Sequence, residues 1–104
     1  MVTWPCLLKL EGDAELIFIA SYTALLDECE ALILSQNDCI IDSVGKSYYL
    51  RTSKGRTVEL EPQKRFYTLE KITELIQKHE FSKAQMCIMK IQFPTIESAV
   101  SALQ

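Results

Sequence analysis

The sequence predicts one α+β domain, with a largely antiparallel sheet and helices packed on it. The chain has 104 residues, 48% hydrophobic and 24% charged, which is the size and composition of a single globular domain. Short apolar segments separated by turn residues outnumber segments of helical periodicity. The domain is expected to span residues 1–104, and its elements follow in the order β-β-α-β-β-β-α-β-α.

The chain is expected to begin with a hairpin of two apolar strands, Trp4–Leu10 and Glu15–Ala20. The second strand is apolar on both faces, which is typical of a central strand covered on both sides. A two-residue turn at Gly12-Asp13 suits type II′, because glycine accepts the positive φ of its first central position. This turn pairs Leu8 with Ile17 and Cys6 with Ile19.

A helix is predicted after this hairpin, with Ser21 as its N-cap. Its apolar stripe recurs at helical spacing and comprises Tyr22, Leu25, Leu26, Cys29, Leu32 and Ile33. The acidic residues Asp27, Glu28 and Glu30 fall off the stripe and predict a solvated acidic face. The helix is expected to end near Ser35-Gln36-Asn37, since asparagine accepts a left-handed cap.

Three strands are predicted next: Cys39–Val44, Ser47–Thr52 and Arg56–Glu61. Gly45-Lys46 is expected to form the first turn, and a three-residue loop ending in Gly55 the second. This loop pairs Leu50 with Val58 and leaves Arg56 at the inner edge near the turn. One face of the hairpin then carries Tyr48, Leu50, Val58 and Leu60, and the other carries Tyr49, Arg51, Thr57, Glu59 and Glu61.

Pro62 is expected to end this hairpin, and Thr68 to cap a helix over Leu69–His79. Alternation of apolar residues predicts a last strand over Cys87–Phe93, although helical continuation from Ser82 through Met86 is the competing interpretation. After Pro94, Thr95 is expected to cap a short helix. Its buried stripe comprises Ile96, Ala99, Val100 and Leu103.

Charge is segregated along the chain. Residues 1–45 hold one basic and eight acidic residues, whereas residues 46–71 hold seven basic and three acidic ones. The basic residues cluster with tyrosine around the predicted second hairpin and the segment after it, in a set that we call the basic–aromatic surface. It comprises Lys46, Tyr49, Arg51, Lys54, Arg56, Lys64 and Arg65.

Three interpretations of the basic–aromatic surface stay open. It can bind an acidic protein surface, or it can be a solvated hairpin whose charges protect its edge from aggregation. It can also stack bases and hold phosphates of single-stranded nucleic acid, but the net charge of −3 argues against that use. An uncovered edge strand also permits a homodimer.

The cysteines and the single histidine suggest no cofactor and no metal site. Cys6, Cys29, Cys39 and Cys87 contain no C-x-x-C pair and lie in apolar segments, so they are expected to be reduced core thiols. The alternative is a small enzyme or thiol-redox protein that uses a cysteine with His79. A structural role for His79 is the favoured interpretation.

No catalytic constellation is legible in the sequence. Asp38, Asp42, Glu59 and Glu61 lie on or beside strands, and we expect them to be solvated rather than paired for acid–base work. The favoured function is therefore a non-enzymatic protein-binding or regulatory module that uses the basic–aromatic surface.

The segments 42–50 (DSVGKSYYL), 79–82 (HEFS) and 87–91 (CIMKI) resemble small uncharacterised proteins of marine gammaproteobacteria. The resemblance covers most of the chain, implies a cytoplasmic bacterial protein and transfers no functional residue. The first residues lack the pattern of a signal peptide, and the longest apolar runs are too short to span a bilayer. We therefore expect a cytoplasmic protein without a membrane partner.

Overall fold

The computed structural model describes residues 1–30, 32, 34–52, 57–84 and 92–104. In these ranges, five strands form one antiparallel sheet of order β2-β1-β3-β4-β5. The strands are β1 (Cys6–Lys9), β2 (Leu16–Ile19), β3 (Cys39–Ile41), β4 (Lys46–Thr52) and β5 (Val58–Phe66). The helices are α1 (Tyr22–Glu30), α2 (Leu69–Ala84) and α3 (Ile96–Ser101).

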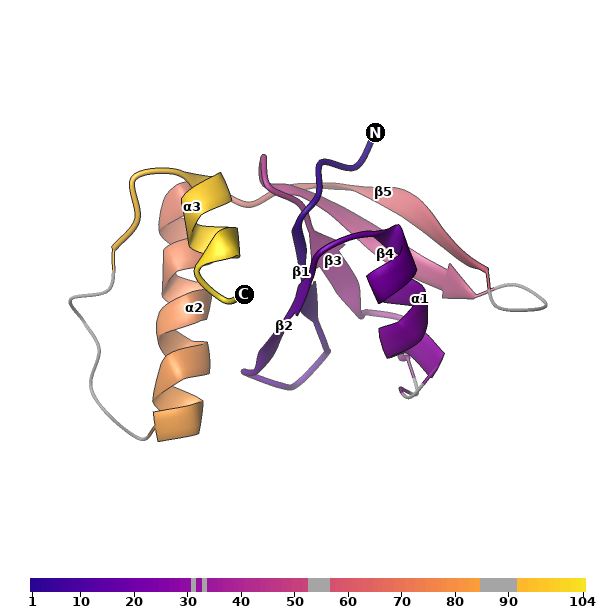
Figure 1. Ribbon diagram of the computed structural model, residues 1–104, viewed down its shortest axis with the longest axis horizontal. Helices are drawn as coiled ribbons and strands as arrows, with labels where there is room; N and C mark the ends of the chain where they lie inside the picture. The colour runs from indigo at the N-terminus through magenta and orange to yellow at the C-terminus, as the bar shows by residue number, and fades with distance from the viewer. Residues whose placement is uncertain (31, 33, 53–56, 85–91) are drawn as a thin grey trace.

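The predicted α+β class, the antiparallel sheet and the order of the described elements are confirmed. In Figure 1, α2 and α3 lie together, and the sheet separates them from α1. The predicted strand over Cys87–Phe93 falls largely on residues 85–91, which lie outside the described residues. Helical continuation is confirmed as far as Ala84, the last residue of α2.

Alternation along the strands divides the core into two layers. The layer beneath α1 contains Cys6, Leu8, Ile19, Leu25, Ile40, Tyr48, Leu50 and Val58. The layer beneath α2 and α3 contains Leu7, Leu16, Ile41, Tyr67, Ile72, Ile76, Ala99 and Val100. The central strands β1 and β3 therefore supply apolar side chains to both faces. The expectation that Glu15–Ala20 forms a central strand is wrong, because β2 lies at the edge of the sheet, although its side chains pack in both layers.

The register of the first hairpin is confirmed, but the predicted turn is wrong. Cys6 lies opposite Ile19 and Leu8 opposite Ile17. The Asp13 N–H donates to the Leu10 carbonyl, so Gly12 is the third residue of the turn, with φ of 77°. A type II turn needs positive φ at this position. The buried Asp38 carboxylate accepts the Glu11 N–H at 2.7 Å and holds the turn there.

The predicted length of the first helix is also wrong, because α1 ends at Glu30. The Ser21 cap is confirmed, since its hydroxyl accepts the Ala24 N–H at 3.2 Å. Asp38 accepts both the backbone N–H and the hydroxyl of Ser35, so this carboxylate organises the chain that leads into β3. Leu32 and Leu34 still pack against the α1 layer.

The second hairpin keeps its predicted faces but shifts by two residues. Leu50 pairs with Leu60, and Thr52 with Val58. A two-residue shift leaves every side chain on its predicted face, since side chains alternate with a period of two. The predicted pairing of Leu50 with Val58 is therefore wrong, and the expectations for the loop and for Arg56 fall on residues 53–56, outside the described residues.

Pro62 does not end the hairpin, because β5 continues through it to Phe66. Proline is tolerated here since β5 is an edge strand, where the missing N–H can face away from the ladder. Pro62 pairs with Tyr48. Val58 and Leu60 lie two and four residues before Pro62 in β5, so their backbone N–H and C=O groups also point away from β4.

Both edge strands are partly capped by side chains. The Tyr22 hydroxyl donates to the Val58 carbonyl and accepts the Val58 N–H, on the outer edge of β5. On β2, the Leu16 N–H donates to Nδ1 of the buried His79 at 2.8 Å. Such caps reduce the number of backbone groups on an edge strand that are available for pairing.

The turn between β3 and β4 brings three parts of the chain together. The Asp42 carboxylate, which has no exposed surface, accepts backbone N–H groups from Thr3, Val44 and Lys46. The Gly45 carbonyl accepts the Tyr67 N–H at 2.7 Å. A Cβ at Gly45 would lie 2.3 Å from the Tyr67 carbonyl oxygen, so no side chain fits there.

Two glycine substitutions distinguish the free-energy cost of the close packing at Gly45 from the cost of positive φ alone. Gly12→Ala should cost about 1 kcal/mol, because φ is 77° but nothing lies within 4 Å of the new Cβ. Gly45→Ala, at φ of 91°, should cost roughly 3–5 kcal/mol, because the new Cβ meets the backbone of Tyr67. Urea unfolding measures both, and equal losses would contradict the close packing of this turn.

Candidate functional site

The acidic face of α1 and the β4 residues Tyr49 and Arg51 of the basic–aromatic surface lie on opposite faces of the sheet. α1 covers one face, and its acidic residues Asp27, Glu28 and Glu30 are exposed. The described part of the α2–α3 layer draws on β1, β2 and β3 but on no residue of β4 or β5. Among the described residues, the helices therefore leave the β4–β5 part of that second face uncovered, and it carries the partly exposed Tyr49 and Arg51.

This open part of the sheet contains a hollow of about 410 Å³, which we call the basic hollow. Its lining comprises Asn37, Tyr49, Gln63, Lys64 and Arg65. Three of these residues are consecutive in β5. They line the hollow because β5 contains extra residues relative to β4 at this point of the hairpin.

A bulge in β5 produces the hollow. Tyr48 pairs with Pro62 and Lys46 with Phe66, so three residues of β5 oppose the single residue Ser47 of β4. The Ser47 hydroxyl donates to the Arg65 carbonyl at 2.9 Å and holds the bulged segment against β4. A bulge redirects side chains, and here Gln63, Lys64 and Arg65 of the bulged segment line one hollow together with Tyr49.

Two tyrosine rings in this region each lie next to an arginine side chain. The Arg51 guanidinium lies 4.8 Å from the centre of the Tyr49 ring, and its Nε is 3.0 Å from the Glu61 carboxylate. Arg65 lies 6.0 Å from the ring centre of the buried Tyr67. Its Nη1 donates to the Tyr67 hydroxyl at 3.4 Å, an interaction that raises the pKa of Arg65.

The structure brings together only part of the basic–aromatic surface. Tyr49, Lys64 and Arg65 line the hollow, and Arg51 flanks it with its charge paired to Glu61. Lys46 lies beyond the bulge, opposite Phe66. The predicted residues Lys54 and Arg56 lie outside the described residues.

Sequence reasoning missed two lining residues, Asn37 and Gln63. Gln63 follows Pro62, which the sequence analysis took as the end of the strand. Asn37 lies in the turn before β3, where its amide donates to Glu11. Neither residue belongs to a charge or hydrophobic pattern, so only the strand pairing could have revealed them.

The expectation of solvated carboxylates is wrong for two of the four residues. Glu59 and Glu61 are exposed, but Asp38 and Asp42 are buried. Each buried carboxylate accepts several hydrogen bonds from nearby backbone or hydroxyl groups, which compensates for its lost hydration. Both carboxylates therefore organise turns of the backbone.

The described thiols are poorly suited to nucleophilic chemistry. Burial, helped by the charge of Asp42, raises the pKa of Cys6 from 9.0 to about 12. Burial also raises the pKa of Cys29 and, against the opposing effect of Lys9, that of Cys39. A reactive cysteine needs a thiolate near neutral pH. His79 is also engaged, since its Nδ1 accepts the Leu16 N–H.

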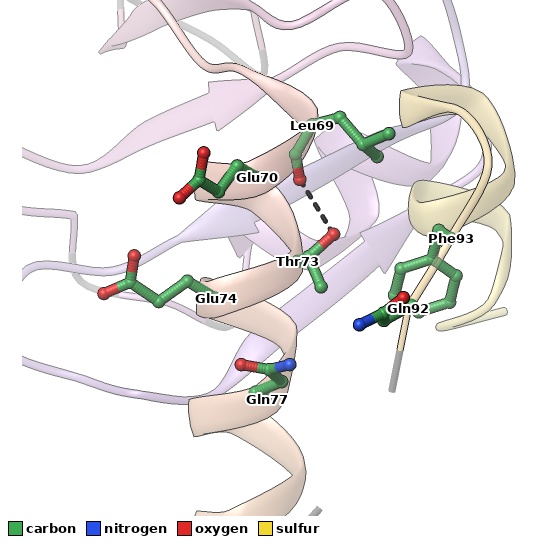
Figure 2. A pocket seen from close by; sticks show the side chains of 7 residues that line it. All are labelled: Leu69, Glu70, Thr73, Glu74, Gln77, Gln92 and Phe93. Carbon is green, nitrogen blue, oxygen red and sulfur yellow. Dashed lines mark hydrogen bonds between the residues drawn. The ribbon is translucent and has the colours of Figure 1, made fainter. Parts of the chain in front are cut away.

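A second hollow, of about 600 Å³, lies between α2 and the segment before α3. Figure 2 shows Thr73 and Gln77 on the side of α2 toward Gln92 and Phe93, whereas the side chains of Glu70 and Glu74 extend away from these two residues. The Thr73 hydroxyl already donates to the Leu69 carbonyl, and Glu74 pairs with Lys71 and Lys78. Two of its polar side chains are thus engaged within the helix, and the described lining of the hollow contains no basic residue, so we take the basic hollow as the better candidate site.

Two kinds of feature are absent from the part of the chain that the structure describes. Its histidine, cysteine and acidic side chains form no group of three that could hold a metal ion. Its helices also lack the combination of length and apolar character needed to cross a membrane.

The raised pKa of Cys6 predicts a loss of stability in alkali. The unfolded chain releases this proton at lower pH than the folded one, so unfolding becomes easier as pH rises from 9.0 toward about 12. The slope for this thiol approaches about 1.4 kcal/mol per pH unit. Cys6→Ala should flatten the profile of urea unfolding against pH. A variant as steep as the wild type would contradict this assignment.

Comparison with known proteins supports the fold and identifies a family. A solved structure, the "NMR structure of the protein from Shewanella Amazonensis", matches with a TM-score of 0.71 and 22% identity. The match covers 99% of this chain and 88% of that chain, and at this identity it establishes the fold alone. No curated protein matches the sequence. A family model described as a protein structure with unknown function matches residues 4–103, so the chain belongs to the DUF4144 family.

Proposed function

We propose that this protein is a non-enzymatic binding module that holds an acidic segment of a partner protein in the basic hollow. The observation that carries the proposal is the bulge in β5. The bulged residues Gln63, Lys64 and Arg65 and the β4 residue Tyr49 line one hollow, beside the part of the sheet that the described helices do not cover.

The chemistry of the hollow suits a carboxylate-bearing chain. Lys64 and Arg65 are exposed and adjacent, and arginine can bind a carboxylate through two parallel hydrogen bonds. Tyr49 is half-buried and supplies a rigid aromatic wall. Asn37 and Gln63 add amide groups, which can bond to the backbone of an extended segment.

The alternatives find less support in the same region. Single-stranded nucleic acid is usually bound by several stacking aromatic rings along a basic groove, whereas the lining of this hollow includes one tyrosine. A thiol enzyme built on Cys6, Cys29 or Cys39 is disfavoured by their raised pKa values. A cytoplasmic site of action, with an acidic soluble partner, agrees with this proposal.

Charge reversal in the hollow tests the proposal. Lys64→Glu combined with Arg65→Glu should abolish binding of an acidic partner, because both cations of the lining become repulsive. The matched control is Lys71→Glu with Lys83→Glu on α2, which changes the net charge equally at exposed positions away from the hollow. Quantitative pull-downs from cell lysate compare the three proteins.

A defined probe gives the same test without an unknown partner. In an NMR titration with a glutamate-rich peptide at low salt, the amide signals of Tyr49, Gln63 and Arg65 should shift, and added salt should reverse the shifts. The control protein should behave like the wild type. Identical partner lists for wild type and hollow variant, together with unshifted signals in the wild type, would refute the proposal.

A further inference from the structure

A second surface lies at the end of the sheet, on the far side of the bulge from the basic hollow. Val44, in the β3–β4 turn, and Phe66, at the end of β5, are 52% and 71% exposed. Large apolar side chains this exposed are few among the described residues. We call Val44 and Phe66 the apolar tip.

Backbone contacts hold the two residues of the tip at the same end of the molecule. Phe66 pairs with Lys46, two residues after Val44. The next residue, Tyr67, donates its N–H to the Gly45 carbonyl at 2.7 Å. In Figure 1 the β3–β4 turn stands at the upper edge of the sheet, where β5 ends. The tip is therefore a fixed part of the fold.

Three cations flank the two tip residues along the chain. Lys46, Lys64 and Arg65 are exposed within two residues of Val44 or Phe66. The carboxylate nearest in sequence to Val44 is Asp42, which is fully buried and bonded to three backbone N–H groups. An anionic surface that meets this end thus encounters cations and apolar side chains together.

We propose that the apolar tip docks on an anionic lipid surface, with Phe66 and Val44 entering the interface and the neighbouring cations meeting lipid phosphates. The charge complementarity is that of basic segments bound to anionic leaflets. An aromatic and a branched apolar side chain on a rigid turn supply the interfacial contact. Among the described residues, neither hollow includes Val44 or Phe66 in its lining, which suits a flat lipid interface better than an inserted peptide.

Vesicle flotation tests the proposal with variants that leave the basic hollow intact. The protein should float with phosphatidylcholine vesicles that contain about 30 mol% phosphatidylglycerol, and not with pure phosphatidylcholine. Phe66→Ser should lower the partition coefficient about tenfold, because the interfacial aromatic is lost. Lys46→Glu should lower it several-fold, and more so at low salt.

Phe81→Ser is the matched control, since Phe81 is 55% exposed on α2 and does not belong to the tip. It should bind vesicles like the wild type. Absence of flotation at low salt, or an equal loss with Phe66→Ser and Phe81→Ser, would overturn the proposal. A third outcome would also overturn it: the wild-type protein does not float, but the NMR signals of Val44 and Phe66 shift when the glutamate-rich peptide is added. That result would assign the tip to a protein partner.

Failure here is distinct from failure of the proposed function. Phe66 and Lys46 do not line the hollow, so their variants should still bind the acidic peptide. Conversely, loss of peptide binding alone leaves the flotation result standing.

Discussion

The buried carboxylate of Asp42 is the constraint on which both candidate surfaces depend. It has no exposed surface and accepts the backbone N–H groups of Thr3, Val44 and Lys46. Each such bond to a charged acceptor contributes about 1.5–3 kcal/mol, which compensates for the burial of a charge. The same charge acts, after burial itself, to raise the pKa of Cys6 and of Tyr48.

The β3–β4 turn influences both candidate surfaces through the backbone of Gly45. Once Asp42 has shaped the turn, the Gly45 carbonyl accepts the Tyr67 N–H, and this bond fixes where β5 ends. Pro62 lies opposite Tyr48, and Phe66 lies opposite Lys46. The three residues between Pro62 and Phe66 therefore have to form the bulge. The bulge lines the basic hollow on one side, and the end of β5 presents Phe66 beside the turn on the other.

Local and periodic features of the chain could be predicted, whereas long-range polar contacts could not. The Ser21 and Thr95 caps and the faces of the second hairpin depend on spacings of a few residues, and all are confirmed. The burial of Asp42 depends on Thr3, which lies 39 positions away, so the general rule that carboxylates are exposed failed. The same holds for the lining of the basic hollow. Tyr49, Lys64 and Arg65 could be predicted as a basic–aromatic cluster, whereas the positions of Asn37 and Gln63 depend on strand pairing.

The central role of Asp42 is tested most directly by native-state hydrogen exchange in Asp42→Asn. This nearly isosteric change puts an amide group where two acceptor oxygens are needed. The account predicts a loss of about 2–4 kcal/mol in unfolding free energy, with exchange accelerated most at Thr3, Val44 and Lys46. The amides of Glu11 and Ser35, which donate to Asp38, provide the internal reference. Unchanged exchange at the three Asp42 partners, with a loss below about 0.5 kcal/mol, would contradict it.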